Sequence, residues 1–199
     1  MEIAQKNIVV VGLGVTGIAV STFLAKRNAH ITAIDSAPES TMGDIPQTLK
    51  ELGIRTEFGT HREQIFENAD LIVLSPGVPH ELAALNQARR IGTPVIGEIE
   101  LASRFISEPI IAVSGTNGKT TTTTLLGEML KESGFSVFVG GNIGNPLITY
   151  ADDHKKADWL VVELSSFQLE TIDRFRPRVA VLLNVTKDHM DRYPNFKAY

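Results

Sequence analysis

Cysteine is absent from the 199 residues, and neither sign of charge dominates them. Without cysteine the chain forms no disulfides and no thiolate metal sites. The formal net charge is −4 and the sequence pI is about 5.7, so we do not expect nucleic acid as a partner. Hydrophobic residues make up 43% and charged residues 21%, the composition of a globular protein with one large domain or two small ones.

Long apolar runs are also missing. None approaches the roughly 18 residues that indicate a membrane-spanning helix, so we expect no membrane insertion. The first residues lack the basic start, apolar centre and cleavage site of a signal peptide. The cytoplasm is therefore the expected location.

The most informative stretch is residues 113–121, Val-Ser-Gly-Thr-Asn-Gly-Lys-Thr-Thr. An apolar run at 109–113 enters it, and a helix-compatible run at 121–132 leaves it. A strand, a glycine-rich turn, Lys-Thr and then a helix form the layout of a phosphate-binding loop. Backbone N–H groups at the start of such a helix make a concave anion site.

Individual residues of this loop have distinct expected tasks. Gly115 and Gly118 let the backbone approach phosphates without a Cβ clash. Lys119 can reach the outer phosphates, and the Thr120 hydroxyl can ligate Mg²⁺. The complete motif has a glycine six residues before the lysine, where this chain has Val113, so the loop is a shortened variant. The alternative is a glycine turn with a solvated lysine.

A second glycine-rich turn lies near the amino terminus. The apolar run 7–11 leads into residues 12–17, Gly-Leu-Gly-Val-Thr-Gly, followed by a predicted helix at 18–28 and a strand at 30–34. This βαβ pattern has the shape of a dinucleotide fingerprint and predicts a phosphate or pyrophosphate at the start of the helix. Asp35, after the second strand, either binds a sugar or base or caps a turn.

The remaining pattern continues as alternating strands and helices. Ser75, Pro76 and Gly77 follow a strand and either line the same crevice as the first glycine turn or form a simple turn. We expect a Rossmann-like parallel-sheet domain at 1–97 and part of a P-loop ATPase α/β domain at 98–199. Further strands are predicted at 55–58, 71–74, 94–96, 136–139, 158–163 and 178–183, and helices at 47–52, 62–68, 81–91 and 98–106. The core face of the helix at 121–132 is predicted to be Leu125, Leu126, Met129 and Leu130.

Two further residues are candidates for metal binding. Glu163 ends an apolar strand, where a carboxylate can hold Mg²⁺ beside Thr120; the alternative is an ion pair with an arginine. His189 lies in a loop after the last strand, where it either ligates a second metal, orients a substrate or is simply exposed.

In six stretches the chain resembles the Mur ligase family, whose superfamily also includes folylpolyglutamate synthetases. The run 164–169, Leu-Ser-Ser-Phe-Gln-Leu, and the simple leading βαβ unit point to the member that adds D-glutamate. The family's shortened loop also accounts for Val113. The matching stretches are 12–17, 74–77, 115–120, 140–144, 163–170 and 184–194.

This resemblance implies an ATP-dependent ligase of peptidoglycan precursor synthesis. It would add D-glutamate to UDP-N-acetylmuramoyl-L-alanine through an acyl phosphate, with ATP and Mg²⁺ as cofactors, as a monomer. By the same likeness, Asp35 and Ser36 would face the uracil, and the first glycine turn would hold a UDP diphosphate. Glu163 would hold one Mg²⁺ and His189 a second.

The residues implied for each role are as follows. ATP binding falls to Gly115, Thr116, Asn117, Gly118, Lys119, Thr120 and Thr121. Substrate binding falls to Gly14, Val15, Thr16, Asp35, Ser36, Ser75, Pro76, Gly77, Asn142 and Ser165. Metal binding falls to Thr120, Glu163 and His189, and catalysis to Lys119, Glu163 and His189.

The family has three domains, and its pattern continues beyond Tyr199 to a lysine, usually carbamylated, that serves the second metal. We therefore expect a fragment, inactive alone, that lacks the third domain and most contacts to D-glutamate. Residues 195–199 read as the start of a helix. Alternatives are a UDP-sugar-binding module without turnover, another ligase of the superfamily, and a nicotinamide-dependent dehydrogenase, which would leave residues 115–120 without a role.

Overall fold

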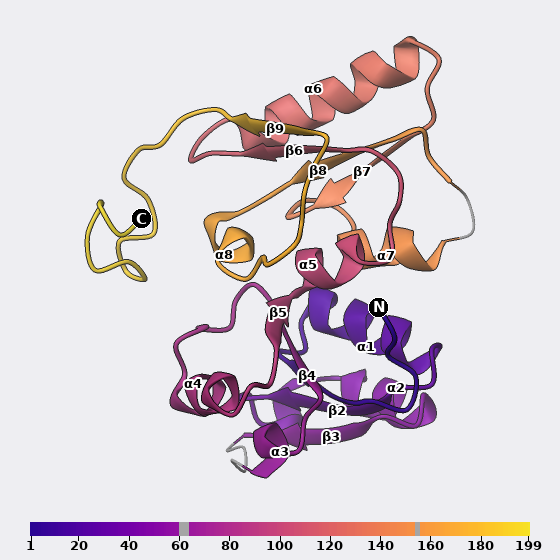
Figure 1. Ribbon diagram of the computed structural model, residues 1–199, viewed down its shortest axis with the longest axis vertical. Helices are drawn as coiled ribbons and strands as arrows, with labels where there is room; N and C mark the ends of the chain where they lie inside the picture. The colour runs from indigo at the N-terminus through magenta and orange to yellow at the C-terminus, as the bar shows by residue number, and fades with distance from the viewer. Residues whose placement is uncertain (60–63, 154–155) are drawn as a thin grey trace.

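The computed structural model describes residues 1–59, 64–153 and 156–199. Its strands form two sheets that follow one another along the chain (Figure 1). The strand order is β3-β2-β1-β4-β5 in the first sheet and β7-β8-β6-β9 in the second, and all these neighbours pair in parallel. The predicted α/β class with two parallel sheets is confirmed. In the part of the chain that is described, no helix is long and apolar enough to cross a membrane.

The first sheet places β1 between β2 and β4, so the strand order reverses beside β1. In a parallel sheet the crevice at such a reversal, beyond the carboxyl ends of the strands, is where ligands bind. The elements are β1 (Asn7–Val11), α1 (Val15–Ala25), β2 (His30–Asp35), a 3₁₀ turn (Glu39–Thr41), α2 (Ile45–Glu51), β3 (Arg55–Phe58), α3 (Gln64–Glu67), β4 (Leu71–Leu74), α4 (Ala83–Arg90) and β5 (Val95–Gly97).

The second sheet has β6 between β8 and β9, so its central strand is the one that enters the phosphate-binding loop. In Figure 1 the long helix α6 lies along one face of this sheet, and α5 and α7 lie toward the first sheet. The elements are α5 (Glu98–Ser103), β6 (Ile110–Ser114), α6 (Lys119–Glu132), β7 (Val137–Gly141), α7 (Leu147–Asp152), β8 (Trp159–Glu163), α8 (Ser166–Leu169) and β9 (Val179–Leu182).

Helix boundaries differ from the prediction where glycine turns precede the helix. α1 begins at Val15 rather than 18, and α6 at Lys119 rather than 121. In each case the helix starts directly after a glycine of the turn, which is its N-cap residue. The helix predicted from residue 62 begins partly outside the described residues. Residues 195–199 form only a turn, in which the amides of Ala198 and Tyr199 donate to the Asn195 carbonyl.

The predicted core face of α6 is wrong at Leu125 and Met129, while Leu126 and Leu130 are half-buried. Leu125 and Met129 are 58% and 56% exposed, whereas Thr123 and Gly127 are buried. A Cβ on Gly127 would lie 2.5 Å from Cγ2 of Val139 on β7. The helix therefore approaches β7 most closely at Gly127, where a larger side chain would clash with Val139.

One cluster of buried apolar residues runs from the first sheet into the second. It includes Phe23 and Leu24 of α1, Leu101 of α5 and Leu147 and Ile148 of α7. A second cluster, on the other face of the first sheet, lies under α3 and α4. The two sheets thus share a continuous core on one side, which fixes how their loops face each other.

Polar contacts reinforce the same junction. Glu100 on α5 is buried, and its Oε2 accepts hydrogen bonds from the backbone N–H groups of Asp173, Arg174 and Phe175 at 2.9, 2.9 and 2.8 Å. Its Oε1 accepts from Nε of Arg104 at 2.7 Å. Burial opposes ionisation, but these hydrogen bonds outweigh it and lower the pKa of Glu100. The ionised carboxylate holds α5 to the loop before β9.

Glu98, two residues earlier, is buried differently. Its Oε1 accepts from the amide of Ile148 at the start of α7 at 2.6 Å, while its Oε2 has no partner among the described residues. Burial raises the pKa of this carboxyl to about 7, against the lowering effect of the backbone hydrogen bonds from Ile148 and Leu147. The protonated acid is therefore the form that suits the junction.

Replacing Glu98 with glutamine removes a pH-dependent part of the stability. The folded chain holds the Glu98 proton more tightly than the unfolded chain, so this contribution is present below about pH 4.5 and is lost as the pH rises through about 7. Denaturant unfolding across this range should show Glu98→Gln gaining up to about 3 kcal/mol over the unaltered chain at the upper end. The exposed Glu132→Gln serves as control. A difference between Glu98→Gln and the unaltered chain that does not change with pH would contradict the assignment.

Candidate functional site

The phosphate loop connects β6 to α6 through two glycines with left-handed backbone. Gly115 has φ 137° and Gly118 φ 84°. A Cβ on Gly115 would lie 3.0 Å from the carbonyl oxygen of Asn184, so backbone from the end of β9 passes directly against the loop. Glycine is needed here for both the backbone angle and the close approach.

Lys119 and Thr120 follow at the start of α6, as predicted. The Lys119 ammonium donates to the Thr116 carbonyl at 2.9 Å and so folds over the loop. The Thr120 hydroxyl donates to Oε2 of Glu163 at 2.9 Å. The loop lysine, the loop threonine and the strand-end acid therefore lie together at the carboxyl end of the second sheet.

Glu163 is only 1% exposed and ends β8. Its Oε1 accepts from Nδ2 of Asn142 at 2.9 Å, so the carboxylate is held between a hydroxyl and an amide rather than by an arginine. Hydroxyl and carboxylate oxygens are hard donors of the type that Mg²⁺ prefers. The side chains of Thr120 and Glu163 thus have the right chemistry for that ion.

Asn184 holds the loop, a role that sequence reasoning missed. Its Oδ1 accepts from the Asn117 amide at 2.9 Å, its Nδ2 donates to the Asn117 carbonyl at 2.8 Å, and its backbone carbonyl accepts from the Thr116 amide at 3.0 Å. The Thr116 hydroxyl also lies 2.9 Å from the Tyr199 hydroxyl. The available signal was position, because Asn184 follows an apolar strand as Glu163 does.

His189 lies on the segment after β9, where its described side-chain contacts are with Asp188 and Phe167. Its side chain is 43% exposed, its Nε2 lies 3.6 Å from Asp188, and its ring centroid lies 4.7 Å from that of Phe167. Across the described residues, no group of three or more His, Asp or Glu side chains gathers where it could hold a metal ion. Its metal role stays a prediction.

A hollow of about 910 Å³ opens at the carboxyl end of the first sheet. It is lined by almost all the predicted substrate-binding residues, together with apolar side chains such as Phe66 and Leu82. Asn142, from the end of β7 in the second sheet, lines it too. The predicted residues that it brings together are Gly14, Val15, Thr16, Asp35, Ser36, Ser75, Pro76, Gly77 and Asn142.

Asp35 lines this hollow and holds the backbone of two neighbouring turns. Its Oδ2 accepts from the Leu13 amide at 2.7 Å and its Oδ1 from the Ala37 amide at 2.9 Å. The turn-capping alternative is therefore observed, while the residue still borders the hollow. Ser75 supports the same turn, since its hydroxyl donates to the Gly12 carbonyl at 2.7 Å.

Ser165 lies outside the hollow and caps α8. Its hydroxyl accepts from the Gln168 amide at 3.3 Å, and the Gln168 side chain accepts from the Ser165 amide at 2.9 Å. This reciprocal cap orients the helix directly after Glu163. The substrate role of Ser165 stays a prediction.

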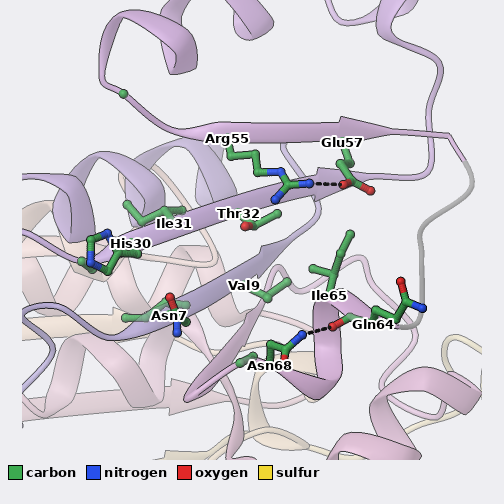
Figure 2. A pocket seen from close by; sticks show the side chains of 14 residues that line it. Asn7, Val9, His30, Ile31, Thr32, Arg55, Glu57, Gln64, Ile65 and Asn68 are labelled. Atoms are coloured by element: carbon green, nitrogen blue, oxygen red, sulfur yellow. Dashed lines mark hydrogen bonds and ion pairs between the residues drawn. The ribbon is translucent and has the colours of Figure 1, made fainter.

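Another hollow, of about 600 Å³, lies toward the amino-terminal ends of the first sheet's strands (Figure 2). Arg55 pairs there with Glu57 at 3.2 Å, and Asn68 donates to the Gln64 carbonyl at 3.2 Å. These two contacts lie within the lining, and no residue of either glycine-rich turn is among the described residues that line it. We assign it no role in the site.

The fold and site define an α/β protein with two glycine-rich turns, residues 12–17 and 115–120, one at the carboxyl end of each sheet. Both turns are of a type that binds anions. Residues 6–97 match the family model for the Mur ligase MurD-like N-terminal domain, and residues 113–199 match that for the Mur ligase middle domain. The chain therefore belongs to the Mur ligase family.

Named relatives agree with this. The chain is 55% identical, over its whole length, to the UDP-N-acetylmuramoylalanine–D-glutamate ligase of Desulfatibacillum aliphaticivorans, of which it covers 44%. It is 54% identical to the enzyme of the same name from Geobacter metallireducens, again with 44% covered. The chain thus spans less than half the length of these curated relatives.

Solved structures support the fold. UDP-N-acetylmuramate:L-alanyl-gamma-D-glutamyl-meso-diaminopimelate ligase from Neisseria meningitides superposes with a TM-score of 0.57 at 22% identity, covering 98% of this chain and 65% of that one. A murein peptide ligase from Psychrobacter arcticus gives a TM-score of 0.53 at 21% identity, covering 94% of this chain and 44% of that one.

Gly17 and Gly14 of the first glycine turn should respond differently to alanine. A Cβ on Gly17 would lie 1.8 Å from the Gly12 carbonyl oxygen, whereas Gly14 has open space around it. Gly17→Ala must push the turn apart and should cost about 1–3 kcal/mol in the free energy of unfolding. Gly14→Ala, the matched control, should stay within about 1 kcal/mol. Denaturant titration measures both, and equal losses would contradict the close packing of Gly17 on Gly12.

Proposed function

We propose that the chain is the UDP-substrate and ATP-binding part of a ligase that joins D-glutamate to UDP-N-acetylmuramoyl-L-alanine in peptidoglycan precursor synthesis. The observation that carries this is Asn142. It donates to Glu163 beside the phosphate loop and also lines the hollow at the first glycine turn. An ATP phosphate at one turn and a UDP-linked carboxylate from the other would meet beside this residue.

Each side of the site has a task in the proposed reaction. At the hollow, the N–H groups of residues 14–16 at the start of α1 would bind the UDP diphosphate. Asp35 holds the Leu13 amide and so fixes the shape of that turn. Ser75, Pro76 and Gly77 also line the hollow. The sugar and its peptide carboxylate would then extend toward Asn142.

On the other side, residues 115–121 would hold the ATP phosphates. Lys119 would leave the Thr116 carbonyl and place its charge beside the outer phosphates. Thr120 and Glu163 would hold Mg²⁺, which supplies neutralisation of phosphate charge during transfer. The γ-phosphoryl group of ATP would pass to the substrate carboxylate, with ADP as the leaving group. The amine of D-glutamate would then attack the acyl phosphate and lose a proton, releasing phosphate and forming the amide.

Some parts of the proposal rest on the family alone. We propose that His189 binds a second metal ion and that Ser165 contacts the substrate. The two domains are proposed to span residues 1–97 and 98–199. The monomeric state, the cytoplasmic location and the contribution of a further domain to D-glutamate binding are proposals too. The relatives carry the name of such a ligase, and this chain matches less than half of their length.

Lys119→Ala in the longer protein that carries this sequence should lower ligation by about 10²- to 10³-fold, because charge stabilisation of the transferring phosphoryl is lost. The measurement is ADP release that depends on UDP-N-acetylmuramoyl-L-alanine and D-glutamate. Lys131→Ala, on the same helix but paired with Glu128 at the surface, is the control and should be unchanged. Undiminished ADP release from Lys119→Ala would remove the phosphate role from this loop.

The 199 residues alone should bind the UDP-substrate without turning it over. Calorimetric titration with UDP-N-acetylmuramoyl-L-alanine should release or absorb heat, and at a hundredfold excess over Kd the ligand should stabilise the fold by about 2.7 kcal/mol. NADH, the ligand expected for the alternative of a nicotinamide-dependent dehydrogenase, should give neither heat nor stabilisation. Neither heat nor a thermal shift with the UDP-substrate would contradict the assignment of the hollow.

A further inference from the structure

Arg192 connects the two halves of the site, although the resemblance at 184–194 implied no role for it. Its Nη1 donates to the Pro76 carbonyl at 3.4 Å, and its Nη2 to the Val78 carbonyl at 3.2 Å. Both carbonyls belong to the turn after β4 that lines the 910 Å³ hollow. Arg192 itself lies on the segment after β9. One side chain from the second half of the chain therefore hydrogen-bonds backbone that lines the hollow at the first glycine turn.

Glu170 fixes the orientation of this arginine. Its Oε2 lies 3.5 Å from Nη2 of Arg192 and 2.8 Å from Nδ1 of His80, and its Oε1 accepts from the Tyr193 hydroxyl. His80 comes from the first half of the chain, directly after the turn, whereas Tyr193 neighbours Arg192. The carboxylate thus gathers groups from both halves, and its side chain is only 17% exposed.

Phe167 supports the guanidinium from its face. The Arg192 Cζ atom lies 4.0 Å from the centroid of this ring, and the ring of His189 lies 4.7 Å from it. The amides of Arg192 and Tyr193 both donate to the His189 carbonyl, at 2.9 and 3.0 Å. Arg192 is therefore one turn away from His189 and shares an aromatic neighbour with it.

A continuous set of hydrogen bonds connects the first glycine turn to Arg192. The Gly12 carbonyl accepts from Ser75, the turn from Ser75 to Val78 is closed by a 3.0 Å hydrogen bond, and Arg192 holds the carbonyls of that turn. A planar guanidinium suits this task because it presents several donors in fixed directions while it stacks on an aromatic ring. A lysine ammonium is a single point charge and does not present several donors in one plane.

We infer that Arg192 is a positioning residue of the ligation reaction, which sets the distance between the UDP-side turn and the loop that bears His189. This inference rests on the proposed function. Arg192 contacts backbone carbonyls of the turn after β4 and not the glycine turn itself. Its loss should therefore leave UDP-substrate binding intact while the carboxylate and the phosphoryl group no longer align. A misplacement of about 1 Å at a reacting centre costs up to about a hundredfold in rate.

The test is steady-state kinetics of the longer protein. Arg192→Gln should lower kcat by about tenfold or more, with KM for ATP and for UDP-N-acetylmuramoyl-L-alanine changed by less than about twofold. Arg192→Lys should recover only part of this loss. The control Arg55→Gln removes an exposed arginine paired with Glu57 on the first sheet and should leave kcat unchanged.

The Glu170→Gln variant provides a second, independent test of the positioning role of Arg192. It keeps the size of the side chain but removes the charge opposite Arg192, and it should lower kcat in the same direction. Because the two residues contact each other, the double variant should be little worse than the poorer single variant. Fully additive losses, or a kcat for Arg192→Gln within twofold of the unaltered protein, overturn the inference.

A purely structural role predicts a different pattern. Arg192→Gln would then lower the Tm and leave kcat and both KM values unchanged below that temperature, which overturns the positioning role while the proposed function stands. Failure of the unaltered protein to form the amide product overturns the proposed function, and this inference with it. Calorimetry with the 199-residue Arg192→Gln chain should give a Kd for the UDP-substrate within about twofold of the unaltered chain; a larger loss of affinity overturns the inference.

Discussion

The apolar contact between α1, α5 and α7 is the constraint on which the site depends. Side chains of these helices form one buried cluster that joins the two sheets on a single side. Each sheet is parallel, so each collects its ligand-binding loops at one edge. Because the shared core fixes one sheet against the other, Asn142 of the second sheet can line the hollow of the first.

Buried carboxylates act at this junction and at the site in contrasting ways. Glu100 receives three backbone amides and an arginine, which favours its ionised form. Glu98 receives amides on one oxygen only, and burial favours its neutral form. Glu163 accepts from a hydroxyl and an amide, and its carboxylate oxygens are of the hard type that Mg²⁺ prefers. The number and type of donors around each acid separate these tasks.

Hydrogen bonds from distant segments give both glycine turns their shape. Asn184 occupies the amides of Thr116 and Asn117, and Asp35 occupies that of Leu13. The phosphate loop is therefore closed by neighbours from the end of β9, and phosphate binding would require exchange of some of these bonds. Arg192, from the segment after β9, donates to the carbonyls of Pro76 and Val78 in the turn that follows β4.

The sequence by itself determined the strands, both glycine turns and most residues of the hollow, because apolar runs and glycine spacing are local signals. It also placed Glu163 beside Thr120, since parallel strands end at one edge. It mispredicted part of the buried face of α6, because the contact of Gly127 with Val139 depends on β7, ten or more residues away. The roles of Asn184 and Arg192 were equally beyond it. Those side chains act on backbone groups roughly 70 to 115 positions earlier, and only the packing of the two sheets brings such groups together.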